Sequence, residues 1–225
     1  PYFLLTDRRY ALMYQRLFAR NAERSPADWL QDWRARRPDL AFMFERRPEA
    51  KHDVAWPAAD LLGVNGWRTH FAEACTGAVV RLGRSWQGGG APRQTLEDWH
   101  GAKIRQLDGL ARMMGAVENT HQPDYITEKV FDAFACGSVP LYVASPMHRI
   151  HELGLPSDSW LNLYGHTPAD AATICADYRL NADIAAAYAA AQRKLAVLLG
   201  NDGIWRQETA QLKLRILTAL AATID

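Results

Sequence analysis

Compact apolar runs alternate with amphipathic segments along most of this chain. The runs are short and bounded by polar, glycine or proline residues, which predicts strands. The predicted strands are 2–5, 39–44, 78–82, 114–118, 141–143 and 160–164. Apolar residues at helical spacing lie between them and predict helices. The predicted helices are 10–22, 27–36, 66–74, 96–113 and most of 169–224, with interruptions near Asn181 and at 200–203.

Strands that alternate with helices predict an α/β fold with a parallel sheet. Such a sheet binds ligands beyond the carboxyl ends of its strands. Three loops follow predicted strands: one with Arg46 and Arg47, a glycine-rich one at 83–90, and one at 119–125. We therefore expect these loops to meet at one edge of the sheet. The segment 49–63 has no clear period and is predicted to be irregular.

The composition is that of a globular protein and narrows the function classes. Of the 225 residues, 48% are hydrophobic and 23% charged, and the formal net charge is +1. A nucleic-acid binder with a concentrated basic face is therefore not expected. Cys75, Cys136 and Cys175 lie in apolar helical contexts without a CxxC or Cys/His spacing. We expect buried free thiols rather than a disulfide, a nucleophile or a metal site.

The chain shows no sign of a membrane span. No apolar run reaches the length of a transmembrane helix, and the first residues lack the pattern of a signal peptide. We expect a cytoplasmic protein of bacterial style, with peripheral association at the inner membrane left open. The chain begins at Pro1 rather than Met, so the existence of upstream sequence is also left open.

The segment 118–142 concentrates polar and charged side chains in a loop and in the first turn of a short helix. Gly137 is placed to end this helix, and an apolar strand follows. A lysine in the first turn opposes the helix dipole, which favours anions there. An anion such as a diphosphate, bound between Lys129 and the free N–H groups of the helix, would resolve this conflict. The alternative is a solvated helix start with Lys129 in water.

This segment resembles the donor-binding signature of glycosyltransferase family ten, the α1,3/α1,4-fucosyltransferases. The match consists of Glu118-Asn119, then Tyr125-Ile126-Thr127-Glu128-Lys129, then Gly137-Ser138-Val139-Pro140, in that order. The resemblance covers roughly residues 39–165 and fades outside them. It implies a Rossmann-like parallel sheet of the GT-B donor-domain type, with a reduced or truncated N-terminal part and a helical C-terminus.

The resemblance also implies roles for individual residues in donor binding. Lys129 would neutralise the diphosphate, and Asn119 would lie near the nucleotide. Tyr125 and Glu128 would contact the sugar or the ribose of the donor. Arg93 would contact the diphosphate, because the donors of a guanidinium match phosphate oxygens; the alternative is a solvated arginine in a surface loop.

Other polar residues of the signature have more than one interpretation. Thr127 is expected to cap the helix, and a ligand contact is also open. Glu118 is expected to be either a donor-site acceptor or an ion-pair partner. His121, His148 and His151 lack ligand spacing with a carboxylate partner, so no metal site is predicted there. No obligatory metal or other cofactor is expected.

The family transfers L-fucose from GDP-β-L-fucose to a sugar hydroxyl with inversion at the anomeric carbon. This chemistry needs cations at the leaving diphosphate and a base for the proton of the acceptor. The resemblance thus implies an inverting, α1,3-type fucosyltransferase that acts on a glycan. In the family the base is a glutamate of the N-terminal half. Nothing singles out Glu23, Asp28 or Glu45 for that role, so no base is assigned.

The organisation implied is a short N-terminal part followed by a donor domain. We expect residues 1–38 to be a reduced acceptor part and residues 39–225 to be the GDP-sugar donor-binding domain with its C-terminal helices. The expected partners are a GDP-sugar and a glycan acceptor; the oligomeric state is open. Two alternatives remain: a glycosyltransferase that uses a different nucleotide sugar, and a non-catalytic domain that binds a nucleotide sugar.

Overall fold

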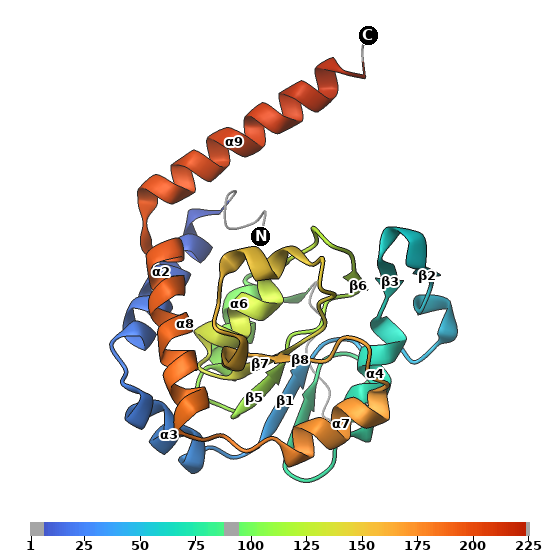
Figure 1. Cartoon of the computed structure of the whole chain (residues 1–225), viewed down its shortest axis with the longest axis vertical. Helices are drawn as coiled ribbons and strands as arrows, with labels where there is room; N and C mark the ends of the chain where they lie inside the picture. Colours follow the sequence, from blue (N-terminus) through green and yellow to red (C-terminus); the bar gives the residue numbers. More distant parts are fainter. Residues whose placement is uncertain (1–6, 88–94, 224–225) are drawn as a thin grey trace.

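A computed structural model describes residues 7–87 and 95–223. Within these residues, five strands form one parallel sheet in the order β4-β1-β5-β7-β8 (Figure 1). The strands are β1 (Leu40–Met43), β4 (Val79–Leu82), β5 (Met113–Gly115), β7 (Val139–Tyr142) and β8 (Leu161–Asn162). The predicted Rossmann-like α/β fold is confirmed. The strand predicted at 2–5 lies outside the described residues.

Helices cover both faces of the sheet. In Figure 1, α2, α3 and α8 lie on one side of the sheet, and α4 and α7 lie on the other. The helices are α2 (Arg8–Ala22), α3 (Pro26–Ala35), α4 (Asn65–Ala74), α5 (Trp99–Leu107), α6 (Glu128–Ala135), α7 (Pro168–Asp177), α8 (Ala182–Gly200) and α9 (Asp202–Ala221). Single 3-10 turns lie at Arg149–Leu153 and Ser157–Ser159.

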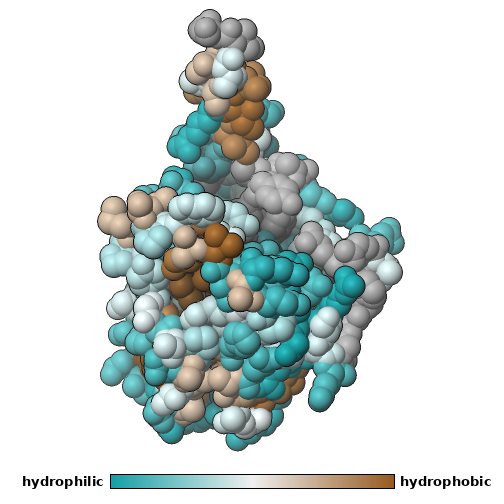
Figure 2. All heavy atoms as spheres, turned by 90° about the vertical axis from the view of Figure 1, so that its right-hand side faces the viewer, coloured by the Kyte–Doolittle hydropathy of each residue, from teal (hydrophilic) through white to brown (hydrophobic). Residues whose placement is uncertain are grey.

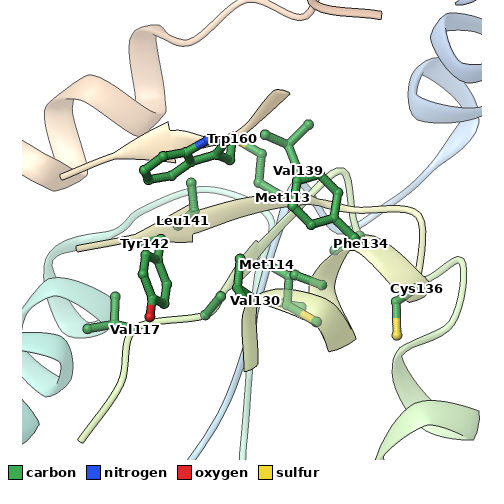
Figure 3. Packing of buried hydrophobic residues seen from close by; sticks show 14 of the residues in the cluster. Met113, Met114, Val117, Val130, Phe134, Cys136, Val139, Leu141, Tyr142 and Trp160 are labelled. Carbon is green, nitrogen blue, oxygen red and sulfur yellow. The ribbon is translucent and has the colours of Figure 1, made fainter. Parts of the chain in front are cut away.

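The core forms where α6 packs on β5 and β7. Figure 3 shows Met114 of β5, Leu141 and Tyr142 of β7, and Val130 and Phe134 of α6 gathered in one cluster. All five are at most 2% exposed, which is the burial expected of strands covered on both faces. The three cysteines are also buried and free, as predicted.

The N-terminal helices are fastened to the end of α6. The indole Nε1 of Trp33 donates to the carbonyl oxygen of Gly137 at 3.0 Å, and Arg36 Nη1 donates to the same oxygen at 2.8 Å. Gly137 has a φ of +71°, and a Cβ there would lie 2.8 Å from the guanidinium of Arg36. Only glycine combines this backbone with this close approach, so the predicted helix end at Gly137 is confirmed. The division of the chain at residue 38 stays a prediction.

The helix predicted at 96–113 is too long. α5 ends at Leu107, and β5 begins at Met113. Gly109 has a φ of +70° and interrupts the helix, while the apolar residues that continue the helical period are buried. Ala111, for example, is 1% exposed and accepts a hydrogen bond from Ser138 Oγ at 2.7 Å. Periodicity alone could not separate a helical face from a buried connection.

The prediction that 49–63 is irregular is wrong. This segment contains two short 3-10 turns, at Ala50–His52 and Pro57–Ala59, and a hairpin of β2 (Ala55–Trp56) and β3 (Leu61–Gly63). β3 also pairs antiparallel with β6 (Thr120–His121). Strands of two or three residues are too short to show a period of two, and this pairing joins segments far apart in the sequence.

The last helix, α9, leaves the body of the molecule (Figure 1). Figure 2 shows hydrophobic residues in a band along this projection, whereas hydrophilic residues cover most of the visible face of the body. Among the described helices, none combines the length and the apolar composition needed to cross a bilayer.

Candidate functional site

The candidate site lies at the carboxyl edge of the sheet, where the three predicted loops meet. Arg46 follows β1, and its N–H donates to the carbonyl oxygen of Arg84, which follows β4, at 3.0 Å. Arg68 of α4 donates from Nη1 to Oδ1 of Asn119, in the loop after β5, at 2.7 Å. The predicted meeting is confirmed as a contact for the loops after β1 and β4, and Arg68 of α4 connects the loop after β5 to this edge.

Glu118 lies at the centre of this edge, with only 3% of its surface exposed. Its Oε1 accepts from the backbone N–H of Thr127 at 2.8 Å, and its Oε2 accepts from Lys129 Nζ at 2.7 Å. The carboxylate therefore sits at the N-terminus of α6, where the helix dipole favours an anion, and it also balances the charge of Lys129. The ion-pair interpretation of Glu118 is confirmed as a contact, whereas its contact with a donor stays a prediction.

Thr127 occupies the N-cap position of α6 but does not cap it. Its side chain accepts no N–H of the helix; instead, its hydroxyl donates to Glu118 at 2.7 Å and accepts from Lys129 Nζ at 3.0 Å. The predicted capping hydrogen bond is therefore wrong, because the hydroxyl oxygen accepts from Lys129 Nζ rather than from a helix N–H. The backbone N–H groups in the first turn of α6 therefore donate no hydrogen bond to the Thr127 side chain.

Arg68 is a site residue that the sequence analysis missed. It is 4% exposed, its guanidinium lies 4.7 Å from the ring centre of Phe44, and its Nε has no hydrogen-bond partner among the described residues. Burial lowers the pKa of Arg68 to about 10, although Glu118 acts in the opposite direction, so the group is charged at neutral pH. One signal was available: Arg68, Phe71 and Ala72 share one face of the predicted helix, and a charged residue on an apolar face needs a partner.

The remaining predicted residues lie around this centre. The side chain of Glu128 is 15% exposed, and its Oε1 lies 3.7 Å from Lys129 Nζ. Burial raises the pKa of Glu128, but Lys129 and Lys103 outweigh burial, and the net effect is a lowered pKa. Tyr125 is 39% exposed and lies close enough to influence the pKa of Arg68. Arg93 lies outside the described residues.

Two more arginines flank this edge. The carboxylate of Glu45 contacts Arg47 Nη2 at 2.6 Å and Arg84 Nη1 at 3.7 Å. Glu45 is thus held as an ion-pair partner, and nothing in its surroundings marks it as the catalytic base.

Behind the site, a buried polar cluster holds α6 in place. Asp132, one turn after Glu128, is fully buried and accepts hydrogen bonds from Tyr14 of α2 and from Lys103 Nζ at 2.7 Å. His100 Nε2 lies 2.8 Å from Oδ1 of Asp132, the oxygen that also accepts from Tyr14, whereas Lys103 contacts Oδ2. The cluster therefore ties α2 and α5 to the helix that carries Glu128 and Lys129.

The titration of Asp132 leads to a prediction about acid stability. Burial raises its pKa, but Lys103 and His100 outweigh burial and lower the pKa from 3.8 to about 2. Between these two pKa values, Asp132 is protonated in the unfolded chain but ionised in the folded one. Its contribution to the free energy of unfolding is therefore complete above pH 4 and is lost as the pH falls through 2. We expect this contribution to be roughly 2 kcal/mol. Urea titrations from pH 5 to pH 2 would measure it as a shallower acid dependence in Asp132→Asn; an unchanged slope would contradict it.

Part of the chain is similar to known proteins. Residues 101–182 match the family model described as the C-terminal region of glycosyltransferase family 10 (fucosyltransferase). A protein of Arabidopsis thaliana, described as a putative fucosyltransferase-like protein, is 29% identical over 119 residues, which are 52% of this chain and 21% of that relative. The match thus spans about a fifth of the length of the curated relative. The matched residues include β5, α6, β7 and the whole of the Glu118–Lys129 cluster, so over this region the chain is similar to glycosyltransferase family 10.

Proposed function

We propose that this chain forms the donor-binding part of an inverting fucosyltransferase, which moves L-fucose from GDP-β-L-fucose to a glycan hydroxyl with α1,3-type linkage. The observation that carries the proposal is that two cations, the partly buried Lys129 and the buried Arg68, lie with the uncapped N-terminus of α6 at the carboxyl edge of a parallel sheet. This is the arrangement expected for a diphosphate.

In the proposed reaction, this site must stabilise GDP as the leaving group. As the acceptor oxygen attacks the anomeric carbon, the bond from that carbon to the diphosphate oxygen breaks, and GDP leaves with the electron pair. Lys129, Arg68 and the first N–H groups of α6 would stabilise the growing charge, since fixed cations and dipoles in a water-poor site act strongly. Lys129 can do this only if phosphate oxygens partly replace the carboxylate of Glu118 as its hydrogen-bond partner.

The other predicted residues would hold the donor. Glu128 and Tyr125 would bind hydroxyl groups of the fucose or the ribose, Asn119 would lie near the nucleotide, and Arg93 would add a phosphate contact. The proton of the acceptor hydroxyl must go to a base, which we place outside this set of residues. We propose no metal ion in the reaction.

Two alternatives predict different ligands or a different outcome. A glycosyltransferase with another nucleotide sugar would bind a different nucleoside diphosphate, and a non-catalytic domain would bind GDP-fucose without transfer. We propose that the working protein is cytoplasmic and that the acceptor is a surface polysaccharide or lipopolysaccharide.

Calorimetric titration with GDP tests the proposal, with UDP and ADP as comparators. We expect selective binding of GDP and a loss of about 10- to 100-fold in affinity for Arg68→Gln, because a hydrogen bond to a charged group contributes about 1.5–3 kcal/mol. The matched control is Arg105→Gln, whose side chain is 71% exposed on α5. Binding of none of the nucleotides by the folded wild-type chain would overturn the proposal, and preferred binding of UDP or ADP would favour another donor.

A further inference from the structure

The β2–β3 hairpin exposes an apolar strip beside the candidate site. Residues 54–59 read Val-Ala-Trp-Pro-Ala-Ala, and all six are exposed. Trp56 is 63% exposed and Val54 is 48% exposed. The strip carries no charged residue, although an aspartate precedes it and another follows it. Contiguous exposed apolar residues on a folded protein mark an interaction site more often than single ones do.

The first aspartate ties the hairpin to the helix of Arg68. Asp53 Oδ1 accepts from the N–H of Gly66 at 2.8 Å and from the N–H of Trp67 at 3.2 Å. Val64, at the N-cap position of α4, has no side-chain oxygen for this purpose, so Asp53 caps α4 from the hairpin. A Cβ on Gly66 would lie 2.0 Å from the Asp53 carboxylate. The glycine is therefore required for this close approach.

The second aspartate ties the hairpin to the loops of the site. Asp60 has a left-handed backbone with a φ of 47°. Its Oδ1 accepts from the hydroxyl of Tyr164 at 3.2 Å, and its Oδ2 accepts from Ser145 Oγ and lies 3.2 Å from His121 Nε2. The strip is thus held at both ends by carboxylates that point inward.

The hairpin is also continuous with the candidate site. β3 pairs with β6 through Gly63 and Thr120, and the N–H of Val64 donates to the carbonyl oxygen of Asn119 at 3.1 Å. Figure 1 shows β2 and β3 standing beside β6 at this edge of the molecule. A ligand bound on the strip would therefore lie next to the proposed donor site.

We propose that residues 54–59 form a platform for the acceptor glycan, on which a sugar ring stacks against the indole of Trp56. This inference rests on the proposed function and deepens it. A pyranose presents C–H groups on its faces, which suit a flat aromatic ring, and its hydroxyl groups stay in water at the rim. The strip has six residues, whereas a stable protein interface takes about 20–30 residues from each partner, so its size fits a sugar better than a protein surface.

A glycan array probed with the purified chain in saturating GDP tests this inference. We expect the wild-type chain to bind a defined group of neutral or acidic oligosaccharides and Trp56→Ala to lose at least tenfold in affinity for them. Trp56→Phe should keep most of the binding, because it keeps an aromatic face. The matched control is Val197→Ala on α8, an exposed apolar residue of similar exposure, at 69%. GDP affinity and melting temperature should be the same in all four proteins.

The possible outcomes separate the two proposals. Glycans that bind wild type and Trp56→Ala equally would overturn the platform, and so would GDP binding without any glycan binding. A sedimentation coefficient that falls on Trp56→Ala would also overturn it, since it would show that the strip holds a second copy of the chain. Failure of the wild-type chain to bind GDP would instead count against the proposed function.

Discussion

Lys129→Met is expected to lower the free energy of unfolding by about 3–5 kcal/mol, because it leaves a buried carboxylate without its cation. Glu118 is 3% exposed, and Lys129 Nζ is its charged partner at 2.7 Å. The same substitution should weaken GDP binding by at least about 1.5 kcal/mol, or roughly tenfold, through the loss of a charge-assisted contact. Chemical denaturation and calorimetry would measure the two effects separately.

A double variant separates the structural role of Lys129 from its binding role. Glu118→Gln combined with Lys129→Met removes both charges, so most of the lost stability should return while GDP binding stays weak. Arg149→Met serves as control, because its pair with Glu152 is exposed on both sides and should contribute no more than about 1 kcal/mol. Recovery of GDP affinity in the double variant would remove Lys129 from the donor site.

Asp132→Ala is expected to destabilise the fold by a similar amount, about 3–5 kcal/mol, because Lys103 would lose the buried carboxylate that holds its charge. The side chain of Lys103 is 11% exposed, and His100 is 1% exposed. Since the cluster joins α2 and α5 to α6, GDP affinity should also fall as the start of α6 loosens. Thermal and urea unfolding at pH 7 would measure the loss of stability.

A surface carboxylate provides the comparison for Asp132. Asp108 pairs with Arg20 through two hydrogen bonds of 2.6 and 2.8 Å, but the side chains are 29% and 48% exposed. Asp108→Ala should therefore cost no more than about 1 kcal/mol. Equal losses for the two variants would show that burial does not set the contribution of Asp132.

Part of the candidate site was predictable from order along the chain. The polar residues from Glu118 to Lys129 follow a strand and open a helix, and both the local pattern and the family resemblance point to them. The pairing between Glu118 and Lys129 was not predictable, because it depends on how the loop after β5 folds back onto α6. The cap expected from Thr127 failed for the same reason.

Arg68 and the hairpin show where local patterns stop being informative. Arg68 donates a hydrogen bond to Asn119, which lies 51 residues away in the sequence. β3 pairs with β6 over a similar sequence separation. The sequence alone determined the alternation of strands and helices, the end of α6 at Gly137 and the edge of the sheet that carries the candidate site, because these follow from periodicity, backbone freedom and strand direction. Only the tertiary structure decided which charges face each other and which apolar residues stay exposed, because both depend on contacts between segments that are distant in the chain.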